Sequence, residues 1–99
     1  MKLILTLLAV FISFSFFSQT LVEGEVQDEK GRFLEWVDVI VEGMNKGATT
    51  NEDGKFSIAS LPRGSYNLIS RTTDFYNDTI RVTLTNEDPV YVVFKLKPV

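Results

Sequence analysis

Histidine and cysteine are both absent from this chain of 99 residues. Without them the chain lacks the usual zinc ligands, and it can form neither a Ser-His or Cys-His nucleophile pair nor a histidine acid–base group. The absence of cysteine also excludes disulfides, so the chain must fold by packing alone. A carboxylate pair is the simplest catalytic group left, but the acidic residues fall in turns or on outward strand faces. We therefore expect no catalytic residue, no metal site and no cofactor.

The chain also lacks a surplus of basic residues. It has 10 Lys and Arg against 13 Asp and Glu, which gives a net charge of −3. The charges are scattered among the strands and turns, without a basic stripe. Nucleic-acid binding therefore has no electrostatic basis in this sequence, and we exclude it.

The longest apolar segment lies at the N-terminus, and it is too short for an ordinary membrane span. The segment LILTLLAVFISFSFF, residues 3–17, follows Lys2 and precedes the small residue Ser18. A span needs about 20 apolar residues, and Thr and Ser interrupt this run. We therefore predict a signal peptide over residues 1–18 that is cleaved after Ser18, with an uncleaved anchor as the alternative. The remaining domain, residues 19–99, would carry no transmembrane segment, and loss of Lys2 changes its net charge to −4.

From residue 21 onward, apolar residues recur at every second position, which is typical of half-buried strands. The alternation covers residues 21–27, 37–42, 48–50, 56–59, 65–72, 79–84 and 90–97. Turn sequences separate these segments, and no helical period is present. The pattern predicts an all-β fold, a seven-stranded antiparallel β-sandwich.

Glycine, proline and aspartate mark the turns between the predicted strands. The turn positions are Gly31, Gly43, Gly47, Asp53, Gly54, Pro62 and Gly64. Two acidic segments, residues 51–53 and 86–88, offer an alternative, because neighbouring loops of this kind can supply oxygen ligands to calcium. Neither segment has the spacing of an EF-hand loop, so we favour turn chemistry for both.

The order of these features closely resembles the carboxypeptidase regulatory-like domain, a transthyretin-like or prealbumin-like β-sandwich. The matching positions are Gly24, Val26, Asp28, Gly31, Leu34, Val39, Val41, Gly43, Gly47, Thr50, Asp53, Gly54, Phe56, Leu61, Pro62, Gly64, Tyr66, Leu68 and Tyr76. The hydrolase branch of transthyretin-like proteins uses histidines and a C-terminal Tyr-Arg-Gly-Ser signature, and both are missing here. Trp36 departs from the family pattern, which has smaller residues or a milder aromatic at that position.

The resemblance implies an accessory module rather than an enzyme. Such domains accompany zinc carboxypeptidases, and they form the periplasmic N-terminal extension of TonB-dependent outer-membrane receptors in Gram-negative cells. The resemblance therefore implies a non-enzymatic interaction module, either free-standing or a fragment of a receptor gene. Its expected location is the periplasm or the outer membrane. Its expected partner is an envelope protein such as a component of a TonB-dependent receptor, bound through strand edges or loop tips.

Several residues are candidates for contact with a ligand or partner. Trp36 either covers the edge of the sandwich or is exposed, and exposed rings at Trp36, Phe75 and Tyr76 would give a platform for carbohydrate as the alternative function. Outward Tyr91 and Val93 make both faces of the last strand apolar, so this strand is either central in its sheet or contacts something. Asp78-Thr79-Ile80 matches a short signal for O-glycosylation at Thr79, or else it is a turn that enters a strand.

Overall fold

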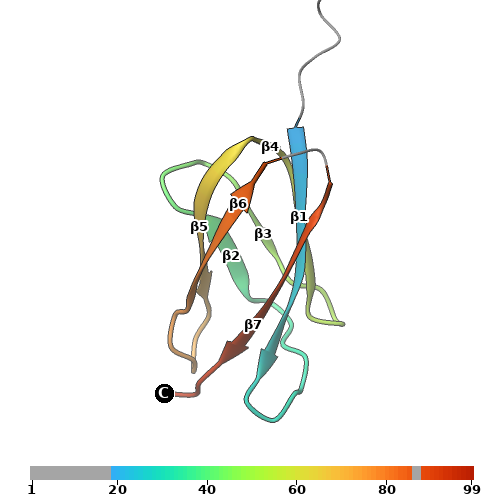
Figure 1. The fold of residues 1–99 in the computed structure, drawn as a ribbon. Coiled ribbons are helices and arrows are strands. Elements are labelled where there is room, and N and C mark those ends of the chain that lie inside the picture. The colour runs from blue at the N-terminus through green and yellow to red at the C-terminus, as the bar shows by residue number, and fades with distance from the viewer. Residues whose placement is uncertain (1–18, 86–87) are drawn as a thin grey trace, which may run out of the picture.

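Two β-sheets face each other in the computed structural model, which describes residues 19–85 and 88–99 (Figure 1). The first sheet has the strand order β4-β1-β7, and the second has the order β3-β2-β5-β6. The strands are β1 (Gln19–Asp28), β2 (Asp38–Val41), β3 (Gly47–Thr49), β4 (Lys55–Pro62), β5 (Gly64–Arg71), β6 (Thr79–Leu84) and β7 (Val90–Leu96). The predicted signal peptide lies outside the described residues. The described part of the chain contains no helix that could cross a bilayer.

The predicted all-β sandwich of seven strands is confirmed, with one difference in strand direction. β1 and β7 pair in parallel, with a register that runs from Val22–Val90 to Asp28–Leu96. The other strand pairs are antiparallel, as predicted. Parallel neighbours require a crossover connection. The chain supplies one because β6, the strand before β7, belongs to the opposite sheet.

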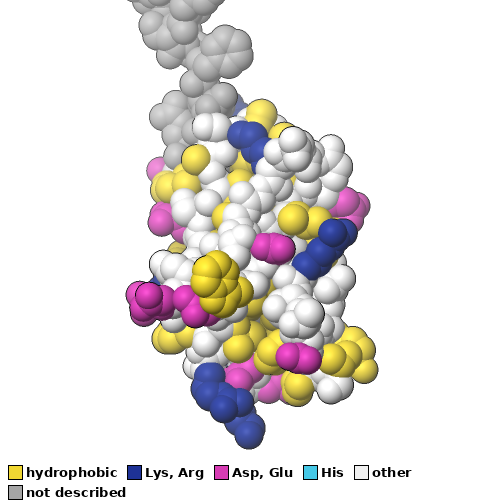
Figure 2. All heavy atoms as spheres, turned by 180° about the vertical axis from the view of Figure 1, so that it is seen from behind, with side chains coloured by type: hydrophobic (Ala, Val, Ile, Leu, Met, Phe, Trp, Pro, Cys, Tyr) yellow, Lys and Arg dark blue, Asp and Glu magenta, His cyan; other side chains and the backbone are white. Residues whose placement is uncertain are grey.

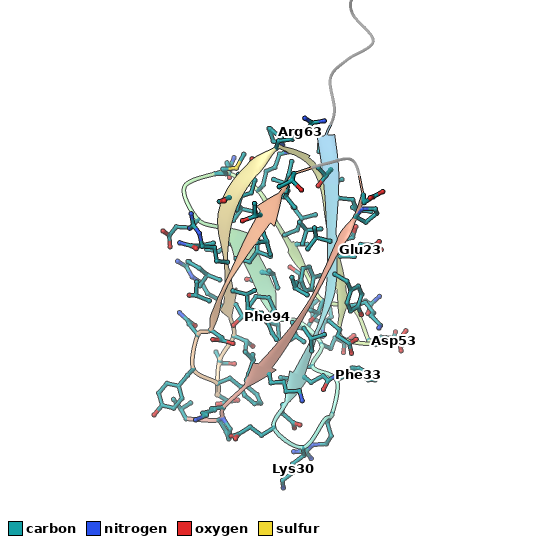
Figure 3. All side chains as sticks on the ribbon, in the orientation of Figure 1. Glu23, Lys30, Phe33, Asp53, Arg63 and Phe94 are labelled. Atoms are coloured by element: carbon teal, nitrogen blue, oxygen red, sulfur yellow. The ribbon has the colours of Figure 1, made fainter. Side chains whose placement is uncertain are left out.

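The inward residues of both sheets form the core, as the two-residue period predicts. Phe94 lies between the sheets in Figure 3, and its ring centroid is 6.2 Å from that of Phe56. Tyr66, Ile80 and Val90 follow the same two-residue period, and they are half-buried at the margin of the core. The buried apolar residues are Val22, Val26, Val37, Val39, Val41, Phe56, Ile58, Leu61, Leu68, Val82, Leu84, Val92, Phe94 and Leu96.

Gly24 lies on the inward face of β1, where a side chain would not fit. A Cβ atom at this position would overlap the carbonyl oxygen of Val92 and would be 2.7 Å from the ring of Phe56. The ring of Phe56, which pairs with Gly24 across β1 and β4, fills the space that the missing side chain leaves. Glycine is therefore required at position 24 by the close approach of β7 and by the packing of Phe56.

The segment 51–66 forms a turn and a strand that is longer than predicted. Asn51 Oδ1 accepts the backbone N–H groups of Asp53 and Lys55 at 2.9 and 3.0 Å, and Gly54 takes a φ of +70°. Pro62, which we predicted in a turn, is instead the last residue of β4. Proline is tolerated there because β4 lies at the edge of its sheet.

Two further glycines that we predicted in turns are the first residues of strands. Gly47 is the first residue of β3, where a Cβ atom would be 2.7 Å from the carbonyl oxygen of Val39. Gly64 is the first residue of β5. Gly31 and Gly43 lie in loops with a positive φ. Glycine therefore serves close strand approach in this fold as well as chain reversal.

Candidate functional site

Four side chains from distant parts of the sequence form a cluster on the outer face of the three-stranded sheet. Glu25 comes from β1, Lys55 from β4 and Tyr91 from β7, and Phe33 comes from the loop after β1. Each of the three strand residues is a direct neighbour of an inward core residue, so strand alternation turns it outward. We call these four residues the Tyr91 cluster.

Hydrogen bonds and ring contacts hold the Tyr91 cluster together across all three strands. The Tyr91 hydroxyl donates to Glu25 Oε1 at 2.7 Å, and the Lys55 ammonium donates to the Tyr91 hydroxyl at 3.0 Å. Lys55 Nζ is also 5.6 Å from the centre of the Tyr91 ring and 5.7 Å from that of Phe33, within the range of cation–π attraction. The ring of Tyr91 is therefore fixed across β1, away from the outer edge of β7.

The electrostatics of the cluster favour the charged forms of Glu25 and Lys55. The hydrogen bond from Gln27, followed by that from Tyr91, lowers the pKa of Glu25. The hydrogen bond to Tyr91, together with the negative charge of Glu25, raises the pKa of Lys55. Both groups are therefore ionised at neutral pH, and neither pKa is moved toward the value that proton transfer at that pH requires.

β7 leaves one edge of the three-stranded sheet without a neighbouring strand. The N–H of Tyr76 donates to the carbonyl of Lys97 at 2.9 Å, so the backbone of Lys97 points away from β1. Backbone groups of alternate residues point the same way along a strand. The N–H and C=O groups of Tyr91, Val93 and Lys95 therefore face this edge, and among the described residues no strand pairs with them there.

The other edges of the two sheets are shorter or better protected than that of β7. β4 has a bulge opposite Leu21, and the Lys46 ammonium covers the edge carbonyls of Ala59 and Ser60 at 3.2 and 2.7 Å. β3 has only three residues, and β6 carries an exposed arginine at position 81. Natural sheets block edges with bulges, lysines and short strands. β7 has seven residues and pairs with β1 without a register shift, which makes it the longest regular edge, and its one charge is that of Lys95.

Trp36 is exposed, which decides between the two alternatives that its sequence position left open. Its side chain is 73% accessible, so it does not cover the edge of the sandwich. Its backbone takes a φ of +65°, a conformation that costs a bulky residue free energy. The N–H of Trp36 donates to the carbonyl of Thr50 at 3.2 Å, and this bond helps to hold the residue in place.

The structure distributes the three predicted platform residues over separate places. Phe75 is half-buried, packs against the core and lines a hollow with Asp28, Arg32 and Pro98. Tyr76 is 60% exposed and lines a different hollow, which Asn77, Asp78, Lys95 and Lys97 complete. Trp36 lines neither hollow, and within the described residues the three rings make no contact with one another.

No large apolar patch is visible on the face seen in Figure 2, where hydrophobic side chains are dispersed among polar and charged ones. Apart from the terminal Val99, the exposed large hydrophobic side chains are Phe33, Trp36, Met44, Tyr76, Tyr91 and Val93. They come from several loops and from β7. Contact sites on this domain are therefore small, and the edge of β7 is the most extended of them.

Thr79, the predicted acceptor of a glycan, is exposed at the start of β6. Its backbone N–H donates to Asp78 Oδ1 at 3.0 Å, and the carbonyl of Asp78 accepts the N–H of Ser70 at 2.9 Å. The aspartate therefore organises the entry of the chain into the strand. The hydroxyl of Thr79 remains accessible, and its modification stays a prediction.

Side-chain oxygens of Asn51 and Asp28 stabilise turns of the fold. Asn51 Oδ1 accepts two backbone N–H groups of the 51–55 turn, and Asp28 Oδ1 accepts the N–H groups of Lys30 and Arg32 at 2.9 Å each. The backbone of Arg32 lowers the pKa of Asp28 most strongly. Asn86 and Glu87 lie outside the described residues. Over residues 19–85 and 88–99, no group of three acidic side chains is placed to hold a metal ion.

The sequence predicts only part of this surface. It identified Tyr91 and Val93 as outward apolar residues and left open whether their strand is central. The structure places β7 at an edge, and it adds Glu25, Phe33 and Lys55 as neighbours of Tyr91. The two-residue period of β1 and β4 predicts that Glu25 and Lys55 point outward, but only the pairing of β1 with β7 brings these two side chains to Tyr91.

The geometry defines a small β-sandwich domain that presents edges, loops and outer faces rather than an enclosed pocket. Within this class the chain belongs to the CarboxypepD_reg-like domain family, whose sequence pattern matches residues 22–99. The family resemblance seen in the sequence is therefore confirmed. A comparison with curated proteins finds no relative of the chain.

Solved structures share the fold at low sequence identity. A chain of a type II cohesin–X-dockerin complex from Acetivibrio cellulolyticus matches with a TM-score of 0.67 and 18% identity over 80% of this chain and 58% of its own length. BcpA, the major pilin subunit of Bacillus cereus, has a TM-score of 0.69 and 13% identity over 83% of this chain and 31% of its own. A proposed carbohydrate-binding protein from Bacteroides uniformis has a TM-score of 0.58 and 13% identity over 82% of this chain and 42% of its own length. The chain spans less than two thirds of the length of each of these three solved structures.

Proposed function

We propose that this chain is an exported, non-enzymatic interaction module of a Gram-negative cell envelope that binds a protein partner by strand addition at β7. The observation that carries the proposal is the free edge of β7, where Tyr91, Val93 and Lys95 direct their backbone groups outward. An extended partner segment gains affinity from main-chain hydrogen bonds to such an edge. Val93, which is 41% exposed, gives the added strand an apolar side chain to contact.

A proline at position 93 tests strand addition directly. Val93→Pro removes the N–H that points to the free edge and spares the ladder to β1, because that ladder uses the alternate residues of β7. Val93→Thr is the matched control, since it keeps both the N–H and a branched side chain. Heptapeptides displayed on phage are selected on the wild-type chain and then tested on both variants. We expect Val93→Pro to lose binding at least tenfold and Val93→Thr to retain it, and equal binding to all three would refute the proposal.

The proposed location is the periplasm or the periplasmic side of the outer membrane. It is supported by the apolar N-terminal segment after Lys2 and by the family match. Fractionation of cells that express the full chain, followed by intact mass measurement, tests it. We expect a periplasmic protein that begins at Gln19, and an envelope protein with an intact Met1 would show that the segment is not cleaved.

A TonB-dependent receptor is the proposed context of the module. The family resemblance supports this context, with the chain either free-standing or a fragment of a receptor gene. Sequencing of the neighbouring reading frame discriminates the two alternatives. An in-frame continuation that encodes a plug and barrel indicates a fragment, and a separate receptor gene beside this one indicates a partner.

Carbohydrate binding is the second candidate, because Trp36 and Tyr76 are 73% and 60% exposed. A fold neighbour that is a proposed carbohydrate-binding protein also favours it. Trp36 is the single tryptophan of the chain, so its fluorescence reports contact with a sugar directly. Titration with xylan, mannan and glucan oligosaccharides would shift the emission to the blue if the sugar covers the ring. No shift with any sugar counts against this function.

A further inference from the structure

We infer that the partner strand at the β7 edge is β7 of a second copy, paired antiparallel about Val93 to join two three-stranded sheets into one of six strands. This inference rests on the proposed function, since it names the occupant of the same edge. Two features of β7 favour a second copy as the partner: the register that its outward backbone groups allow, and the charges of its side chains. Such a dimer has closed two-fold symmetry, in which the same surface of each copy contacts the other.

The register about Val93 uses every outward backbone group of the strand. In that register Val93 faces Val93 of the second copy, and Tyr91 faces its Lys95, with the reverse pair on the other side of the axis. All these residues direct N–H and C=O groups to the free edge, so all become hydrogen-bonded pairs. Three residues of each copy are satisfied at once.

Other two-fold registers satisfy fewer groups. A shift of the axis to residue 92 places Lys95 opposite Pro89, which has no N–H to donate. A shift to residue 94 places Tyr91 opposite Lys97, whose carbonyl already accepts the N–H of Tyr76. An axis at residue 95 places two lysines directly opposite each other, and like charges there are destabilising. The Val93 axis is therefore the favoured one.

Charge complementarity also supports a second copy at this edge. On the outer face Glu23 of β1 lies beside Tyr91, and Gln27 lies beside Lys95. The pairing about Val93 extends these neighbours into a row of Glu23, Tyr91, the second copy's Lys95 and its Gln27. Each exposed lysine thus lies on the same row as a carboxylate of the other copy, and the two valines meet at the centre. Figure 3 shows Glu23 beside β1, on the side of the three-stranded sheet.

The first test measures the mass of the chain in solution. The full chain is expressed with its own leader, purified, and examined by sedimentation equilibrium from low to high micromolar concentration. We expect a concentration-dependent dimer, since an edge contact is at the small end of interface sizes. Val93→Lys places two like charges on the axis and should weaken the dimer at least tenfold. Val99→Lys is the matched control, because Val99 is also exposed but lies beyond the paired residues.

A cysteine at the axis tests the register. The chain has no cysteine, so Val93→Cys introduces the only one, and the Cα atoms of a hydrogen-bonded antiparallel pair are about 5.5 Å apart, within disulfide range. We expect mild oxidation to give a covalent dimer of Val93→Cys. Tyr91→Cys should not cross-link to itself, since its counterpart lies opposite Lys95. A mixture of Tyr91→Cys and Lys95→Cys should give the mixed dimer.

The outcomes separate this inference from the function on which it rests. A wild-type chain that stays monomeric at every concentration, or a Val93→Cys variant that does not cross-link, overturns the dimer. If that chain still binds displayed peptides through the same edge, the edge receives a strand of another protein. A dimer that persists unchanged in Val93→Lys is formed by another surface, and this result also overturns the inference.

Discussion

Replacement of Thr50 by valine would remove a buried hydroxyl that holds the loop before β2 in place. Thr50 Oγ1 accepts the N–H of Val37 at 2.9 Å and donates to the carbonyl of Leu34 at 2.7 Å. Thr50 is 3% exposed and Val37 is fully buried, so water does not readily replace these bonds. Valine has nearly the same shape, and the substitution therefore deletes the two hydrogen bonds while it leaves the packed volume almost unchanged.

The expected destabilisation follows from the partners that the variant leaves behind. A buried group that loses its hydrogen bond costs about 1–3 kcal/mol, and Thr50→Val leaves one donor and one acceptor without their partner. We estimate a loss of about 3 kcal/mol in the free energy of unfolding. In a domain of this size each kcal/mol shifts the Tm by about 4–8 °C, so the expected shift is roughly 12–24 °C.

Thr20 provides a matched control for Thr50. It is equally buried, at 3% exposure, but among the described residues its hydroxyl has no hydrogen-bond partner. Thr20→Val should therefore be neutral or stabilise the fold by up to about 1 kcal/mol, since it removes an unsatisfied polar group. Thermal and urea unfolding followed by circular dichroism measure both variants. Equal destabilisation by the two substitutions would refute the assignment of the Thr50 hydroxyl as a structural bridge.

Three further substitutions test other parts of the fold. Gly24→Ala should cost about 3 kcal/mol in urea unfolding, the upper end for overpacking, because its Cβ atom would meet the backbone oxygen of Val92. Asp28→Asn should lower the free energy of unfolding at neutral pH, because the Arg32 turn lowers the pKa of Asp28 in the folded chain and so stabilises the fold when Asp28 is ionised. The difference between the variant and the wild type should shrink as the pH falls below the ordinary pKa of 3.8, since the wild type loses that stability in acid. Trp36→Gly should raise the Tm, since glycine removes about 1–2 kcal/mol of strain at positive φ.

The sequence predicts the core well because inward position is a local property. A period of two assigns a face to each residue before any pairing is known, and residues such as Val39, Phe56 and Phe94 are buried as expected. The extra length of β4 was missed at Leu61 and Pro62, where the chain passes a bulge at Ser60 with a φ of +62°. A bulge depends on the partner strand, which the local pattern does not contain.

The candidate site was predicted less completely, because it depends on contacts between distant segments. The hydrogen bond from Tyr91 to Glu25 joins residues 66 positions apart. No local pattern indicates that the last strand lies parallel to the first, and this pairing alone creates both the Tyr91 cluster and the free edge beside it. The exposure of Trp36 likewise depends on Thr50, which determines the course of the loop from the far side of β3.

Two exposed features of this chain conflict with the rules that its other positions follow. Where the loops take a positive φ, the chain uses glycine at positions 31, 43 and 54 and the short polar Asp74, yet at position 36 it retains a bulky tryptophan. Where β4 forms an edge, a bulge and a lysine protect it, yet β7 has no bulge against β1 and exposes Tyr91 and Val93 beside its one lysine. Neither exception benefits the core, because the Trp36 ring and the outer face of β7 are exposed. Strain and exposed apolar surface that the fold does not require support the proposed contact with another molecule.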